Sequence, residues 1–157
     1  MDPGDRIAAL LDGAGWADAR RSDLAGDASA RRYARLVRAD GATAVLMQAP
    51  VGEAAERDSL AAFLRVGAHL RALGLSAPEV WAVDAAAGLV LIEDLGDATL
   101  ARLLRDDPAV AREAYGVMAG AVLPHLAREA LPDWAARPEA GAQAGMIDLT
   151  LGMLPDP

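Results

Sequence analysis

The chain has 157 residues, a formal net charge of −8 and 54% hydrophobic residues. This length suits one domain or slightly more, and the acidic charge argues against a surface for nucleic acid or anionic membranes. All 15 basic residues are arginines and there is no cysteine, which excludes a catalytic or phosphate-clamping lysine, a thiolate, a disulfide and a cysteine metal site within this chain. The acidic N-terminus and the short apolar runs predict neither a signal peptide nor a membrane span, so we expect a cytoplasmic protein.

The first part of the chain is predicted to form one helix and three strands. Apolar residues at Ile7, Leu10 and Leu11 recur at helical spacing, and glycines follow them. The dipeptide Asp40-Gly41 lies between two apolar stretches, which is the strongest short-range signal of a β-hairpin. The expected elements are a helix over 3–14, a strand over 22–25, a strand through Tyr33, Leu36 and Val37, and a strand over 42–47.

A small polar loop, Gly26-Asp27-Ala28-Ser29, joins the first two predicted strands. A loop of this kind can offer backbone N–H groups to phosphates. Small polar loops with one glycine also occur in ordinary hairpins, so the loop by itself is compatible with both interpretations.

The rest of the chain is predicted to form a long helix, two strands and further helices. Leu60, Phe63 and Leu64 lie on one face of the long helix, and Gly74 suits its C-terminal end. The expected elements are helix 53–73, strands 80–83 and 89–92, the acidic stretch 93–97, a short helix from Thr99, and a helix over 109–129 in which Pro124 introduces a kink or lies near the end. The predicted fold class is α+β, with a mostly antiparallel five-stranded sheet and one long helix, followed by more helices.

Three segments, 26–36, 44–50 and 91–96, in this order resemble the small lobe of the protein-kinase-like fold. They resemble more closely the aminoglycoside phosphotransferase family of small-molecule kinases. Within that family the chain is similar to the bacterial N-acetylmuramate/N-acetylglucosamine kinases, which phosphorylate cell-wall amino sugars at the anomeric position.

The resemblance implies a nucleotide site that takes ATP or GTP with Mg²⁺. The glycine-bearing loop would cover the phosphates, the third strand would pack against the base, and backbone groups of the segment after the last strand would bind the edge of the base as a hinge. Glu53 or Glu56 would begin the helix that carries an ion-pairing glutamate in kinases. The implied nucleotide-binding residues are Gly26, Asp27, Ala28, Ser29, Ala30, Arg32, Val45, Met47, Glu93, Asp94 and Leu95, with no catalytic or metal-binding residue assigned.

The sequence departs from the kinase pattern on the third strand, where kinases place a lysine that holds phosphates and this chain has Met47. Arg31, Arg32 or Arg35 would have to supply the positive charge, and the sequence leaves all three open. Strand alternation separates them, because Arg31 and Tyr33 fall on one face and Arg32 falls on the other.

The second departure is the absence of the family's catalytic loop, His-Gly-Asp followed by Asn, and of its later metal-binding aspartate. Neither histidine replaces them: His69 lies within the long predicted helix, and His125 lacks Asp or Asn at the required spacing. We therefore expect residues 1–95 to form a kinase-like small lobe, and residues 96–157 to form a hinge and the start of an incomplete helical lobe. The chain alone is expected to be inactive, as a fragment of a longer enzyme.

These observations favour the hypothesis that the chain is the N-terminal portion of a phosphotransferase. The complete enzyme would transfer the γ-phosphoryl group of ATP to a sugar or aminoglycoside-type hydroxyl, and the favoured acceptor is an amino sugar of cell-wall recycling. One alternative is a nucleotide-binding or interaction module without catalysis, and another is an α+β scaffold without a ligand. The implied partner is a small-molecule acceptor rather than nucleic acid or membrane, and the oligomeric state is open.

Overall fold

A computed structural model describes residues 2–24, 30–97, 100–128 and 132. The chain divides into two compact units, Met1–Asp106 and Asp107–Pro157, which are described separately below. The first unit holds a five-stranded sheet and three helices, and the second holds one interrupted helix within its described part.

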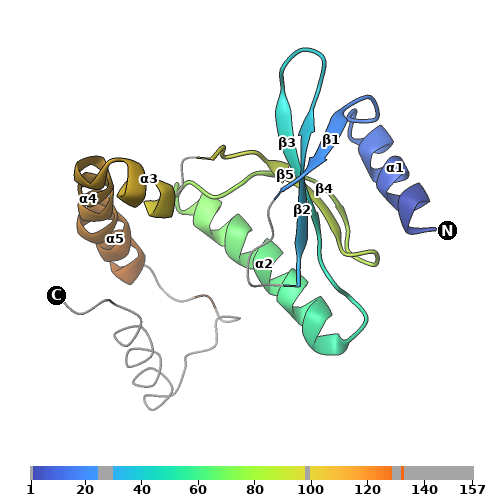
Figure 1. Ribbon diagram of the computed structural model, residues 1–157. Coiled ribbons are helices and arrows are strands. Elements are labelled where there is room, and N and C mark those ends of the chain that lie inside the picture. The colour runs from blue at the N-terminus through green and yellow to red at the C-terminus, as the bar shows by residue number, and fades with distance from the viewer. Residues whose placement is uncertain (1, 25–29, 98–99, 129–131, 133–157) are drawn as a thin grey trace. The chain divides into compact units, whose positions relative to one another are not determined.

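The sheet of the first unit is antiparallel throughout and has the strand order β1-β2-β3-β5-β4 (Figure 1). This arrangement confirms the predicted α+β fold with an antiparallel five-stranded sheet. The predicted turn at Asp40-Gly41 joins β2 to β3, with Gly41 at a φ of 87° and the N–H of Ala42 donating to Oδ1 of Asp40 at 3.0 Å. The strands are β1 (Arg20–Asp23), β2 (Arg32–Val37), β3 (Thr43–Gln48), β4 (Val80–Asp84) and β5 (Leu89–Glu93).

Both faces of the sheet carry a buried apolar cluster, because the inner strands β3 and β5 are apolar at consecutive positions. One face packs against helix α1 (Pro3–Gly13), and Figure 1 shows α1 and α2 on opposite sides of the strands. The cluster on the α1 face contains Leu11, Trp16, Leu36, Ala44, Leu46 and Leu91. The cluster on the face of helix α2 (Ala54–Ala72) contains Val45, Met47, Leu60, Val90 and Ile92.

Helix α2 begins with a capping box, in which the N–H of Glu53 donates to Oε2 of Glu56 at 2.9 Å. Its sheet-facing side holds Leu60, Phe63 and Leu64, the face that the spacing predicted. Gly74 follows the helix at a φ of 75°, a left-handed conformation that glycine adopts without steric cost. Both glutamates at the start of α2 therefore serve to cap it.

The remaining helices are α3 (Leu100–Asp106) in the first unit, and α4 (Pro108–Val117) and α5 (Leu123–Arg128) in the second. Asp107 caps α4 by accepting from the N–H groups of Ala109 and Val110. A π-helical segment, η1 (Met118–Val122), joins α4 to α5 just before Pro124. Since proline has no N–H to donate, a wider turn at this point accommodates it within a continuing helix. Among the described residues, no helix has the length and apolar character needed to cross a bilayer.

Candidate functional site

The predicted base-binding residues of β3 lie on the α2 face of the sheet. Val45 and Met47 are 8% and 0% exposed, and they are paired in register with Ile92 and Val90 of β5. Glu93 ends β5 opposite Ala44, so the chain leaves the sheet directly beside this apolar wall. The structure thus brings the predicted base wall and the predicted hinge together on neighbouring strands.

Glu93 is anchored to the residues that precede β4. Its N–H donates to the carbonyl of Glu79 at 2.8 Å, and its Oε2 accepts from the N–H of Glu79 at 3.0 Å. Arg71, near the end of α2, places its guanidinium 3.8 Å from the same carboxylate. The N–H of Glu93, one of the predicted hinge residues, is thus donated within the fold.

Arg35 on β2 ties the segment after β5 to the sheet. Its Nε lies 2.7 Å from Oδ2 of Asp94, an ion-pair contact outside hydrogen-bond alignment, and its Nη2 donates to Oδ1 of Asp94 at 3.1 Å. Its Nη1 and Nη2 donate to the two oxygens of Asp97 at 3.0 and 2.8 Å. One guanidinium therefore holds two carboxylates that follow the same strand.

Electrostatics keeps both carboxylates charged. Burial acts to raise the pKa of Asp94, but the N–H of Gly96 and the Arg35 guanidinium outweigh it, so the pKa is lowered overall. The hydrogen bonds from Arg35 lower the pKa of Asp97. The two aspartates in turn raise the pKa of Arg35, with the hydrogen bonds to Asp97 contributing most.

Sequence reasoning placed Asp94 in the hinge but did not predict its pairing with Arg35. The signal that could have found this pairing was the alternation of side chains along β2. Arg35 shares the face of Tyr33, and that face of β2 contributes to the α2-side cluster. An arginine at such a position requires an acidic partner, and the acidic stretch after β5 was the nearest source.

Arg31 lies on the α2 face immediately after the glycine-bearing loop. Its guanidinium stacks over the ring of Phe63 at 5.2 Å and donates from Nη2 to Oγ of Ser59 at 3.1 Å. The side chain lines a hollow of about 320 Å³ together with Ala30, Pro50 and residues of the first half of α2. Helix α2 thus fixes a cation beside the end of the predicted phosphate loop, whose residues Gly26 to Ser29 lie outside the described part of the chain.

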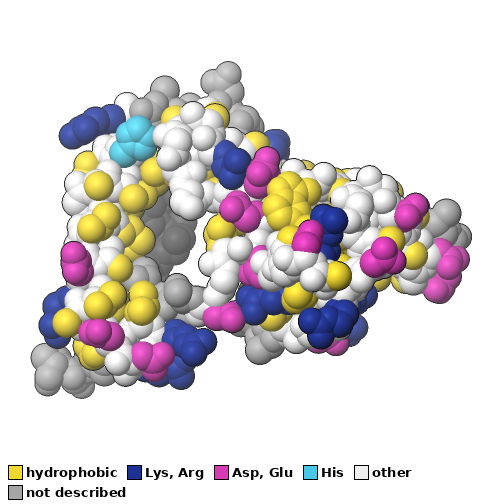
Figure 2. Space-filling model, turned by 90° about the horizontal axis from the view of Figure 1, so that it is seen from above, with side chains coloured by type: hydrophobic (Ala, Val, Ile, Leu, Met, Phe, Trp, Pro, Cys, Tyr) yellow, Lys and Arg dark blue, Asp and Glu magenta, His cyan; other side chains and the backbone are white. Residues whose placement is uncertain are grey.

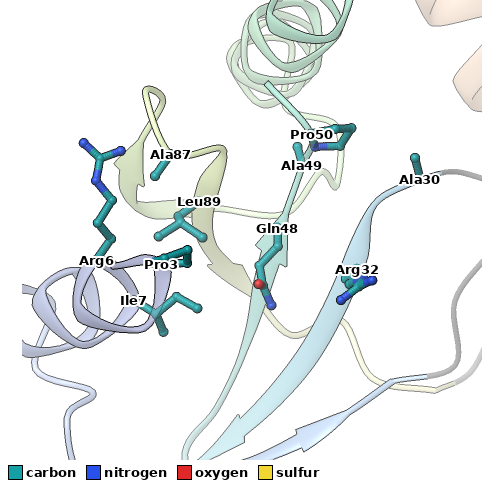
Figure 3. Close-up of a pocket in the computed structure, with 10 residues that line it drawn as sticks. All are labelled: Pro3, Arg6, Ile7, Ala30, Arg32, Gln48, Ala49, Pro50, Ala87 and Leu89. Atoms are coloured by element: carbon teal, nitrogen blue, oxygen red, sulfur yellow. The ribbon is translucent and has the colours of Figure 1, made fainter. Parts of the chain in front are cut away.

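Arg32 lies at the start of β2 and lines a different pocket, of about 530 Å³. Figure 3 shows this pocket between α1, the ends of β2 and β3, and the turn before β5, with Pro3 and Ile7 of α1 facing Leu89. By strand alternation Arg32 shares the face of Ala34 and Leu36, the α1 face. The structure therefore does not bring Arg32 together with Val45 and Met47.

Figure 2 shows acidic and basic side chains interspersed on the face that it displays. Ion pairs of this unit include Arg6 with Asp84 and Arg38 with Asp40. Within the described ranges, no group of three or more histidine or acidic side chains is placed to hold a metal ion.

Taken together, the antiparallel sheet, the helix across one face and the hinge beside β3 define a kinase-like small lobe. The comparison with known families agrees, since the phosphotransferase enzyme family matches residues 21–152. The chain therefore belongs to the phosphotransferase enzyme family.

One curated relative of the chain is the N-acetylmuramate/N-acetylglucosamine kinase of Caulobacter vibrioides. The two sequences are 40% identical over 119 residues, which cover 62% of this chain and 33% of the relative. The chain thus spans about a third of the length of the curated relative that it matches.

Proposed function

We propose that this chain supplies the nucleotide-binding lobe of a cytoplasmic small-molecule kinase. In the complete reaction the γ-phosphoryl group of ATP, bound with Mg²⁺, passes to a sugar hydroxyl. The favoured acceptor is an amino sugar of the class named in the Caulobacter vibrioides relative. Such transfer depends mainly on positioning and charge neutralisation, which are the tasks of a small lobe and its loop.

The observation that carries this proposal is the position of the hinge relative to β3. Val45 and Met47 belong to the apolar cluster on the α2 face, and the chain leaves β5 at Glu93, one register position from the Val45–Ile92 pair. An apolar side chain such as Val45 beside backbone polar groups suits a purine, which has an apolar face and a hydrogen-bonding edge.

Arg31 is the proposed phosphate-facing cation in place of the missing lysine. Met47 is buried in the α2-side cluster, and Arg35 is held by Asp94 and Asp97. Arg31 instead combines the correct face with a position next to the loop, and its contacts with Ser59 and Phe63 of α2 orient it. Arginine suits this role because its planar fork matches phosphate oxygens.

Isothermal titration of Mg²⁺-ATP into the 157-residue chain tests the proposal. A double substitution, Gly26→Val with Ser29→Val, should abolish binding, whereas Asp40→Asn in the turn at the opposite end of β2 should leave it unchanged. Saturable binding that survives the loop substitution, or no binding to the unaltered chain, would contradict the proposal.

A second experiment separates binding from turnover. Because the sequence contains no His-Gly-Asp loop with its following Asn, we expect the chain to bind ATP without consuming it in the presence of N-acetylmuramate. Phosphorylated sugar detected by mass spectrometry, above a mock purification, would show that the chain is itself catalytic.

A further inference from the structure

Arg35 contacts one short segment, residues 94–97, with all three nitrogens of its guanidinium, whereas a simple surface ion pair needs only one. It faces Asp94 with Nε and Nη2, and it faces Asp97 with Nη1 and Nη2, at distances from 2.7 to 3.1 Å. The side chain of Asp94 is 5% exposed and that of Arg35 is 21% exposed. A hydrogen-bonded fork to Asp97 and an ion pair with one hydrogen bond to Asp94, both from one guanidinium, fix the distance and the orientation of the segment.

The segment held in this way turns sharply after β5. Gly96 has a φ of 80°, and its N–H donates to Oδ1 of Asp94 at 2.9 Å. The same carboxylate therefore closes the turn and accepts from Arg35, whose position in the sequence is 59 residues away. The backbone of Asp94 and Leu95 lies inside this restrained stretch.

Arg35 also lies beside the apolar wall. It is the register partner of Val45, so the two side chains leave neighbouring strands on the same face of the sheet. A base resting on Val45 would have the strand that carries Arg35 on one side and the segment after β5 on the other. The Arg35 guanidinium thus connects β2, on one side of the proposed base position, to the segment after β5 on the other side.

Resting on the nucleotide-binding function proposed above, we propose that Arg35 is a positioning residue for the base of the nucleotide. By gripping Asp94 and Asp97 from β2, it holds the backbone of Asp94 and Leu95 in the conformation that meets the purine edge. Such preorganisation increases affinity because the segment does not have to be ordered when the ligand binds.

A purely structural tether would have a different signature. Exposed ion pairs contribute little to stability, and Asp97 is 62% exposed, so its fork with Arg35 gains little for the fold. Loss of a structural tether would weaken every ligand of the lobe equally. Loss of a base-positioning residue would weaken only ligands that carry a base.

The experiment measures the dissociation constants of Mg²⁺-ATP and of Mg²⁺ with inorganic triphosphate for the 157-residue chain and its variants. Arg35→Gln and Arg35→Lys should each weaken ATP binding about tenfold or more, and should leave triphosphate binding within about twofold. The lysine variant keeps the charge but cannot form the fork, so it should fail to rescue. Arg38→Gln, which removes an arginine paired with Asp40 on the hairpin, should change neither constant.

Asp97→Asn provides a second route that does not disturb the buried carboxylate. It removes one charge from an exposed position, so the variant is expected to fold, and it should reproduce part of the loss for ATP alone. Unchanged ATP affinity in the Arg35 variants, or equal losses for ATP and triphosphate, would overturn the inference while the proposed function stands. Failure of the unaltered chain to bind either ligand would instead overturn the proposed function and this inference with it.

Discussion

Met47 of β3 and Leu60 of α2 belong to the same buried cluster, with 0% and 2% of their surfaces exposed. In the kinase pattern the corresponding strand residue is a lysine that pairs with a glutamate of the helix. At this position β3 and α2 are joined by apolar packing of Met47 and Leu60 instead of an ion pair. In the proposed nucleotide site the phosphate-facing cation is therefore assigned to Arg31, next to the loop, rather than to β3.

Met47→Lys should destabilise the first unit strongly rather than restore a kinase-like site. An ammonium at this position would lie among Val45, Leu60 and Val90 without a carboxylate in the cluster, at a cost on the order of 3–5 kcal/mol. Met47→Leu, which keeps the volume, should cost less than about 1.5 kcal/mol. Urea unfolding followed by tryptophan fluorescence compares the two, and equal midpoints would contradict the burial of Met47.

Arg31 and Arg32 are adjacent residues and form a matched pair, because Arg31 contacts Phe63 and Ser59 of α2, whereas Arg32 lines the pocket beside α1. Arg31→Gln should weaken ATP binding by about tenfold and adenosine binding little, since a charge-assisted phosphate contact is typically worth about 1.5–3 kcal/mol. Arg32→Gln should leave both affinities unchanged. Weaker ATP binding in Arg32→Gln, with ATP binding unchanged in Arg31→Gln, would instead assign the phosphate contact to Arg32, one of the nucleotide-binding residues predicted from the sequence.

Alanine at three glycines should produce three different results. Gly88 has a φ of 70° and its added Cβ would collide with the carbonyl of Ala49, so Gly88→Ala should cost several kcal/mol. Gly41 has a φ of 87° with open space around it, and alanine should cost only the backbone strain of about 1–2 kcal/mol. Gly67 lies within α2 with nothing near its missing Cβ, so alanine should stabilise by about 0.5–1 kcal/mol.

Thermal and urea unfolding of these three variants test the backbone geometry directly. The ranking of stability should be Gly67→Ala, then the unaltered chain, then Gly41→Ala and finally Gly88→Ala. A Gly88→Ala variant as stable as Gly41→Ala would show that the strands next to Gly88 are more loosely packed than the contact with Ala49 implies.

The contribution of Arg35 to stability should depend on pH on the acid side. The folded-state pKa values of Asp94 and Asp97 are lowered, so their pairing with Arg35 stabilises the fold above the unfolded carboxyl pKa of about 3.9. That stabilisation is lost as the pH falls below about 4 and the carboxylates become protonated. The difference in unfolding free energy between the unaltered chain and Arg35→Gln should therefore be present at pH 6 and shrink toward pH 3.

Denaturant titrations at a series of pH values measure this difference. Arg21→Gln serves as the control, since Arg21 lies 3.9 Å from the largely exposed Asp23. A difference for Arg35→Gln that stays constant from pH 6 to pH 3 would show that the two aspartates are not its source.

Local signals predicted most of the elements of the first unit. The turn at Asp40-Gly41 and the apolar spacing of α2 depend on residues close together in the sequence, where backbone preferences and periodicity act directly. The pairing of Arg35 with Asp94 and Asp97 joins residues 59 and 62 positions apart. No local preference encodes such a contact, and it becomes visible only when β2, β3 and β5 are placed side by side.

The sequence by itself determined the kinds of elements, the lack of lysine and cysteine, and the family resemblance, because composition and short-range patterns suffice for these. It also predicted that Arg31 and Arg32 point to opposite sides, since side chains alternate along an extended chain. Only the tertiary structure decided which side meets α2, and so which of the two arginines contacts that helix: Arg31, through Ser59 and Phe63. The physical reason is that the alternation of side chains along a strand decides which residues share a face. Which of the two faces a helix covers depends on where helices distant in the sequence pack.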